Sequence, residues 1–319
     1  MTRASTPAAS TNPMPAKAIP PNRDRLQSQI LVWITTAAFF ALACLAPTYL
    51  LWQAHLTRAY LLKVLLISVA FAYAAWRLKA ATPSAAILGG VTCLFITTFS
   101  SIPGNISPFH SALTPLLLLF VLTFAATRLG RARKATAGLA ESRRGRNAAQ
   151  VIANLGIAAL LLSPPLSGFV GVGYTTREGH VLYVILSCVP TLAALAEATA
   201  DTVSSEIGQA FGGTPFMLTT LRRVPPGTDG AISLYGTLAG IAAAALIAAT
   251  GAPALGMSLT ECVVAFAAGV AGLFFDSLLG ATGERKGWIG NDLVNFASTA
   301  FAAGITLLAI RFSQDYLLH

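Results

Sequence analysis

The sequence predicts an all-α membrane protein, a polytopic transmembrane helix bundle of about nine spans. Of its 319 residues, 55% are hydrophobic and only 10% are charged, and the mean hydropathy is +0.68. Soluble domains carry roughly 25% charged residues, so this shortage of charge indicates an integral membrane protein. The second observation is a series of apolar stretches of about the length that crosses a bilayer, and the third is a one-sided distribution of Lys and Arg.

The chain divides into four regions. Residues 1–28 are rich in Ala, Pro, Ser, Thr and Asn, and we expect a disordered tail because they have little apolar surface to bury. An N-terminal transmembrane region follows over 29–128, with predicted spans at 30–51, 59–76, 84–100 and 111–127. A basic cytoplasmic loop over 129–147 leads to a core region over 148–319, with predicted spans at 148–164, 181–199, 231–250, 258–280 and 293–311.

The positive-inside rule supports this arrangement. With the amino terminus in the cytoplasm and nine alternating spans, 17 of the 21 Lys and Arg residues fall on the cytoplasmic side. We therefore expect a multi-pass protein of the cell membrane, with a cytoplasmic amino terminus and an extracytoplasmic carboxyl terminus. The net charge of +9 then reflects topology and contact with the lipid bilayer, and no nucleic-acid partner is predicted. The basic loop is either a lipid anchor or a phosphate-binding patch.

The first polar segment is DTVSSEIG, residues 201–208, at the cytoplasmic end of the sixth predicted span. On a helix, Glu197, Asp201 and Ser205 share one face, and Glu206 points elsewhere unless the helix breaks. Carboxylates with a hydroxyl suit Mg²⁺. The alternative is that Asp201 caps a short helix through backbone N–H groups.

The second segment is TTLRRVPPGTDG, residues 219–230. Its Pro-Pro-Gly sequence predicts a turn, and glycine-rich turns can direct backbone N–H groups at an anion. Arg222 and Arg223 are candidates for pairing with phosphate oxygens. The alternative is a plain cytoplasmic loop whose arginines set the topology.

The third segment is DSLLGATGERKGWIGNDLVN, residues 276–295. Asp276 lies about one turn inside the eighth span, where a carboxylate needs a partner or a cation. Lys286 in the following loop is a further candidate for phosphate. Asn291 or Asp292 is a candidate N-cap of the ninth span.

Several standard signatures are absent from the sequence. There is no Walker P-loop, no zinc-binding spacing of His and Cys, and no credible Ser-His-Asp arrangement. The four cysteines each lie alone in an apolar run, which is typical of small buried side chains. Ser258 and Glu261 form a capping-box pattern, so we expect Glu261 to be structural.

Together the three segments bring carboxylates, hydroxyls, glycines and basic residues to one membrane face. This mixture is typical of metal-assisted chemistry on a phosphate. We expect the catalytic, metal-binding residues to be Asp201, Glu206 and Asp276. We expect Arg222, Arg223 and Lys286 to neutralise phosphate charge.

The same residues resemble a known family, the domain of unknown function 92 family, which includes transmembrane protein 19 and the phytyl-phosphate kinase of tocopherol synthesis. The matching pieces are RGRNAAQVIANLG at 144–156, ADTVSSEIG at 200–208, TTLRRVPPGTDGAISLYG at 219–236, DSLLGAT at 276–282 and NDLVNF at 291–296. They run in order over about 130–320. The first four spans match only as hydrophobic segments, and Pro226 and Ala231 depart from the pattern of some relatives.

The resemblance implies a kinase at the cytoplasmic face, and the carboxylates and hydroxyls suggest Mg²⁺ as its cofactor. Such an enzyme transfers phosphate from a nucleoside triphosphate such as CTP to an isoprenyl monophosphate in the membrane. Carried over residue by residue, it adds the substrate-binding residues Ser205, Gly227, Thr228, Asn291 and Asn295. Two other functions stay open: a lipid or ion transporter using Asp276 and Glu197, and a membrane scaffold whose polar loops bind another protein.

Overall fold

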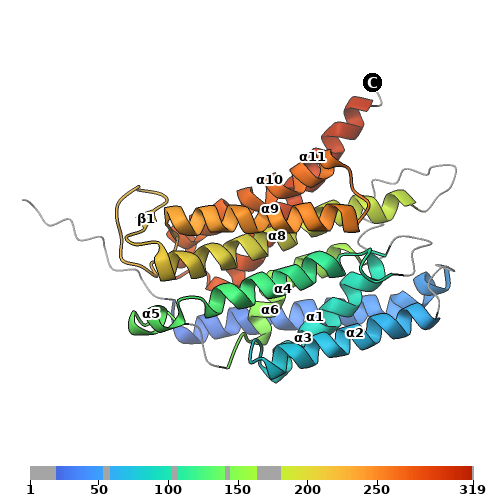
Figure 1. Ribbon diagram of the computed structural model, residues 1–319, viewed down its shortest axis with the longest axis horizontal. Helices are drawn as coiled ribbons and strands as arrows, with labels where there is room; N and C mark the ends of the chain where they lie inside the picture. Colours follow the sequence, from blue (N-terminus) through green and yellow to red (C-terminus); the bar gives the residue numbers. More distant parts are fainter. Residues whose placement is uncertain (1–18, 53–57, 102–106, 141–143, 164–180, 318–319) are drawn as a thin grey trace, which may run out of the picture.

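The computed structural model describes residues 19–52, 58–101, 107–140, 144–163 and 181–317. Its described part is a bundle of helices, and its strands, β1 (Phe216–Met217) and β2 (Ala231–Ile232), have two residues each and pair antiparallel (Figure 1). The prediction of an all-α fold is confirmed.

Every predicted span coincides with a helix in the structure. The first half of the chain forms α1 (Pro21–Trp52), α2 (Arg58–Arg77), α3 (Pro83–Phe99), α4 (Leu113–Arg128), α5 (Arg131–Thr136) and α6 (Ala148–Leu161). The second half forms α8 (Val181–Phe211), α9 (Leu234–Ala254), α10 (Leu259–Leu279), a π-helical turn η1 (Gly280–Glu284) and α11 (Asn291–Leu317). The segments 259–284 and 291–310, together with α2 and α9, are long and apolar enough to cross a membrane, and α3, α4 and α6 are shorter apolar helices.

Polar side chains fix where several helices begin. Asn147 and Gln150 form a capping box at the start of α6, and Ser233 accepts a hydrogen bond from the Gly236 N–H at the start of α9. The predicted capping box of Ser258 and Glu261 is confirmed at the start of α10. These caps satisfy N–H groups that have no partner within the helix.

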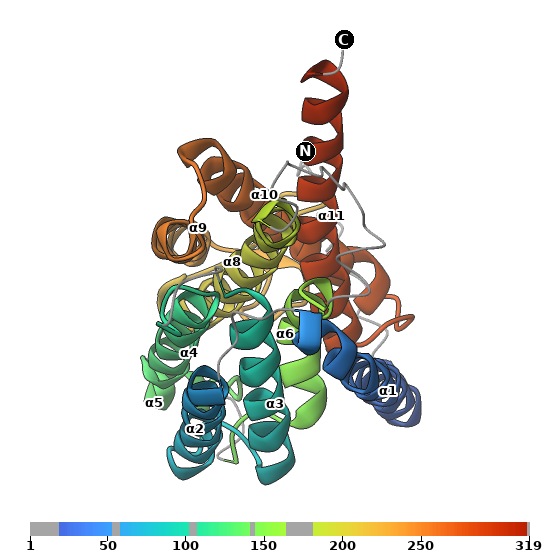
Figure 2. The same ribbon diagram turned by 90° about the vertical axis from the view of Figure 1, so that its right-hand side faces the viewer.

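Helix α8 lies at the centre of the bundle and packs against α4, α6, α9, α10 and α11 (Figure 2). All residues from 187 to 200 are buried, and alanines such as Ala193 and Ala196 let neighbouring helices approach closely. Gly269 of α10 faces Ala196, where a β-carbon would come within 2.8 Å of the alanine methyl. The carboxyl-terminal third of α8 leaves this apolar core and reaches a polar region.

The structure corrects two boundaries. Residues 21–28, predicted as part of the disordered tail, are helical, and residues 1–18 lie outside the described part. The Gln27 side chain donates to the Trp288 carbonyl at 2.8 Å, and Ser28 donates to Asp292 at 2.6 Å. These partners, about 260 residues away, explain why local composition did not reveal the helix. Helix α8 also continues twelve residues beyond the predicted end of its span at 199.

Candidate functional site

The three polar segments meet at one cavity of about 360 Å³. Its walls come from α8, the loop between β1 and β2, the end of α10 with η1, the start of α11 and the start of α6. Eight of the predicted site residues line it: Asp201, Ser205, Glu206, Gly227, Thr228, Asp276, Asn291 and Asn295.

A pair of carboxyl groups lies at the centre of the cavity wall. Asp201 projects from α8 and Asp276 from α10, both line the cavity, and their carboxyl groups interact with each other. Asp276 also accepts a hydrogen bond of 3.1 Å from the hydroxyl of Ser298 on α11. Asp201 lies ten residues before the end of an unbroken helix, so the alternative in which it caps a short helix is wrong.

Further carboxylates surround this pair. Glu197 lies one turn before Asp201 and is 1% exposed, and its Oε1 has no hydrogen-bond partner among the described residues. Glu284 of η1 lines the cavity, and both glutamates interact electrostatically with Asp276. Carboxyl groups gathered in a poorly solvated region need a partner or a cation.

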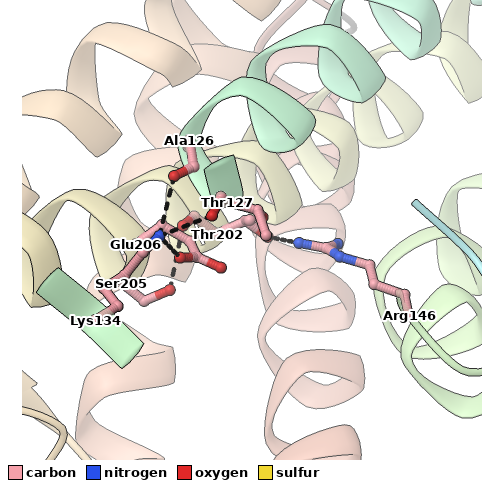
Figure 3. Close-up of polar contacts among 7 residues, drawn as sticks. All are labelled: Ala126, Thr127, Lys134, Arg146, Thr202, Ser205 and Glu206. Atoms are coloured by element: carbon pink, nitrogen blue, oxygen red, sulfur yellow. Dashed lines mark hydrogen bonds and ion pairs between the residues drawn. The ribbon is translucent and has the colours of Figure 1, made fainter. Parts of the chain in front are cut away.

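Glu206 is held by a lysine rather than by the aspartates. Lys134 of α5 is fully buried, forms an ion pair with Glu206, and donates to the carbonyls of Ala126 and Thr127 at 3.2 and 3.0 Å (Figure 3). No group of three or more acidic, His or Cys side chains in the described part could hold a metal ion. The structure therefore does not support the predicted metal set of Asp201, Glu206 and Asp276, because the Glu206 charge is already neutralised.

Arg146 is the basic residue that the described part of the chain places in the cavity wall, and the sequence reasoning missed it as a site residue. Its guanidinium donates to the Thr202 hydroxyl at 3.2 Å and interacts electrostatically with Asp201 (Figure 3). Its backbone is fixed by a short bridge to Ala81, in which the Arg146 N–H donates to the Ala80 carbonyl at 2.9 Å. One feature of the sequence could have identified Arg146 as a site residue. It lies just before Asn147, the N-cap of α6, within the 144–156 segment that resembles the family.

The three basic residues predicted to bind phosphate lie outside the cavity lining. Arg222 is exposed, Arg223 lies 5.7 Å from the ring of Phe216, and Lys286 lies 4.7 Å from the ring of Trp288. All three residues are exposed. The cavity lining contains Arg146 and none of these three residues, and their role in binding phosphate stays a prediction.

The loop between the two strands forms the rim of the cavity. The predicted turn at Pro225 is present: the Thr228 N–H and hydroxyl both donate to the Pro225 carbonyl, at 3.3 and 2.7 Å. Gly230 has a φ of 71° and packs directly against the backbone of Ala281 in η1. Burial raises the pKa of the Asp229 carboxyl, and the nearby Arg285 opposes that shift. Close glycine contacts thus join the loop to the π-helical turn.

Apolar helices that surround a polar, carboxylate-lined cavity define an integral membrane protein with a built site at one end of its bundle. The chain belongs to the integral membrane protein DUF92 family, whose model matches residues 66–303.

Three relatives have related sequences. The uncharacterized membrane protein sll0875 of Synechocystis is 32% identical over 60% of this chain and 71% of its own length. The protein VTE6, chloroplastic, of Arabidopsis thaliana is 30% identical over 60% of this chain and 56% of its own length. The uncharacterized membrane protein MJ0933 of Methanocaldococcus jannaschii is 34% identical over 66% of this chain and 82% of its own length. No solved structure matches the chain.

Proposed function

We propose that this protein is a Mg²⁺-dependent phosphotransferase that transfers a phosphoryl group from a nucleoside triphosphate such as CTP to an isoprenyl monophosphate. The observation that supports it most is the carboxyl pair of Asp201 and Asp276, which opens into the same cavity as Arg146 and a glycine-rich turn. Phosphoryl transfer needs charge neutralisation and positioning more than covalent chemistry by the protein.

The carboxyl pair fits Mg²⁺ in number and kind. Proteins usually hold this ion with one or two carboxylates, and substrate phosphates and water complete its shell. Asp201 and Asp276 would hold it, and Ser298 orients Asp276 through its hydrogen bond. When bound, the ion would neutralise charge on the transferring phosphoryl group.

The remaining groups of the cavity suit the phosphates. Arg146 offers a planar guanidinium that can bind two phosphate oxygens at once. The turn at Gly227 and Thr228 also lines the cavity, and Asn291 and Asn295 supply neutral polar groups. The acceptor, a phosphate oxygen, is already ionised, so no general base is needed: it bonds to the terminal phosphorus as the bond to the nucleoside diphosphate breaks.

The test is turnover by the purified protein in nanodiscs, with geranylgeranyl monophosphate, CTP or ATP, and Mg²⁺. We expect prenyl diphosphate to form, and we expect D201N and D276N each to lower kcat at least a hundredfold, because each removes a charge that holds the ion. Glu261→Gln is the matched control, since that carboxylate caps α10 at the other end of the helix from Asp276. Folded protein without turnover for any nucleotide would exclude this function, as would full activity in both aspartate variants.

A second candidate function is ion-coupled transport, and Glu197 favours it. This carboxyl is buried one helical turn deeper than Asp201, with an oxygen that has no partner among the described residues. Transport predicts that protein in sealed vesicles moves substrate without producing a diphosphate. Assaying the vesicles both for substrate uptake and for prenyl diphosphate decides between the two functions.

A further inference from the structure

A second, smaller cavity lies inside the bundle next to the polar one. It has a volume of about 90 Å³ and is lined mainly by residues of α2, α3, α4 and α6. Its wall is largely apolar, with Phe71 and Phe120 in edge-to-face contact at 5.2 Å between ring centres. Small residues, including Ala85 and Gly89 of α3, leave the space that larger side chains would fill. We call this cavity the chain pocket.

The chain pocket adjoins the polar cavity. Arg146 and Asn154 line both. Asn154 is 5% exposed, and its Nδ2 donates to the Gln150 carbonyl at 2.7 Å, but its Oδ1 has no hydrogen-bond partner among the described residues. A buried polar atom without a partner destabilises the protein. A buried acceptor at the junction of two cavities therefore indicates a ligand or water that reaches it.

The charges around the chain pocket fit an anion. Its described lining includes Lys79, Arg128, Arg131 and Arg146 but no acidic residue. Arg128 lies 4.4 Å from the ring of Phe124 and donates to the Leu78 carbonyl, so part of this positive charge is held at the end of the apolar helices. An apolar wall below a basic rim is complementary to an anionic amphiphile.

We propose that the chain pocket binds the first part of a single hydrocarbon chain, whose phosphate lies beside Arg146 in the polar cavity. The inference rests on the proposed function and locates the hydrocarbon chain of its substrate. At about 30 Å³ for each group the size of a water molecule, a cavity of about 90 Å³ holds about three such groups. That is enough for the first carbons of one chain and too little for the paired chains of a diacyl lipid.

Substitutions at Gly89 test the pocket. A β-carbon there would lie 3.6 Å from the Phe71 ring, an ordinary contact, so G89A keeps the fold and narrows the space, whereas G89L fills it. The probe is radiolabelled geranylgeranyl monophosphate, with protein in nanodiscs. We expect its Kd to rise about tenfold or more in G89L and less in G89A. The Kd of inorganic phosphate should stay unchanged. Ala242→Leu on the exposed face of α9 is the matched control and should bind as wild type does.

The outcomes separate the pocket from the reaction. The pocket assignment is overturned if G89L and G89A bind the prenyl phosphate as tightly as wild type, or if diacyl phosphatidic acid competes as well as the prenyl phosphate. If prenyl phosphate binding depends on Gly89 but no nucleotide supports turnover, the pocket stands and the proposed reaction fails. If turnover occurs and is insensitive to Gly89, the reaction stands and the pocket fails.

Discussion

At the scale of single residues, Lys134 shows what a run of basic side chains can conceal. It belongs to a stretch with seven basic residues between 128 and 146, yet none of its surface is exposed and it pairs with Glu206. A buried charge is tolerated when it is paired and when its other donors have acceptors. Here the carbonyls of Ala126 and Thr127 accept the other hydrogen bonds of the Lys134 ammonium group. The Lys134–Glu206 ion pair holds α5 against α8, the helix that carries Asp201.

We predict that K134M destabilises the protein by about 3–5 kcal/mol, because it leaves the Glu206 carboxylate buried without a partner. The double variant K134M/E206M should recover most of that loss, since an apolar pair of similar size replaces a desolvated ion pair. Thermal unfolding of purified protein in detergent measures both effects. Arg133→Met is the control, because Arg133 is exposed and its loss should change stability by less than about 0.5 kcal/mol.

The same variants decide the role of Glu206. If its carboxylate serves only to hold Lys134, the double variant keeps its activity once it is folded. A folded double variant without activity would restore Glu206 to the metal site. This is a sharper test than E206Q alone, which would leave the lysine unpaired and confuse loss of structure with loss of function.

The acidic site residues could be predicted from the sequence better than the basic ones. A carboxylate within an apolar helix stands out, since burial without a partner is expensive, and Asp201 and Asp276 were found in this way. Arginines are also expected at the cytoplasmic ends of spans for topology. Composition therefore did not distinguish Arg146, which lines the cavity, from Arg222, which is exposed.

At the scale of elements, apolar runs located the helices but not all of their ends. Hydropathy places a boundary where polar residues begin, and α8 passes through such residues because Lys134, Arg146 and neighbouring helices provide partners for them. The start of α1 was missed for the same reason, since its polar residues contact the loop before α11. Tertiary partners, which the local sequence does not reveal, set these ends.

The contact between the β1–β2 loop and η1 gives a prediction at this scale. We expect G230A to destabilise the protein and to lower turnover at least tenfold, because a β-carbon would collide with the Ala281 backbone and displace the cavity rim. Gly213 is the matched control: its φ of 66° imposes a similar backbone strain, but a β-carbon there has nothing within 4 Å. G213A should cost about 1–3 kcal/mol of stability and keep its turnover. Equal turnover in the two variants would contradict a role for this contact in shaping the site.

At the scale of the whole molecule, the helices place a polar cavity at one end of the bundle and the chain pocket beside it. Segments that are separated by more than a hundred residues meet there, with Arg146 from the start of α6 and Asp276 from the end of α10. The order of the spans predicts that the three polar segments lie on the same side of the membrane, because an even number of spans separates them. The shape and depth of the cavities depend on side-chain packing and could not be predicted in this way.

Orientation in the membrane is the last prediction, and it follows from charge. Arg222, Arg223 and Lys286 lie in loops at the cavity end, so the positive-inside rule places this end in the cytoplasm, where nucleoside triphosphates are available. With the four native cysteines replaced by alanine, we expect a membrane-impermeant maleimide to label T260C in intact cells. T220C, in the loop beside the cavity, should be labelled only after permeabilisation. Labelling of T220C in intact cells would place the cavity on the outer face, and a reaction that uses a cytoplasmic nucleotide would then lack its donor.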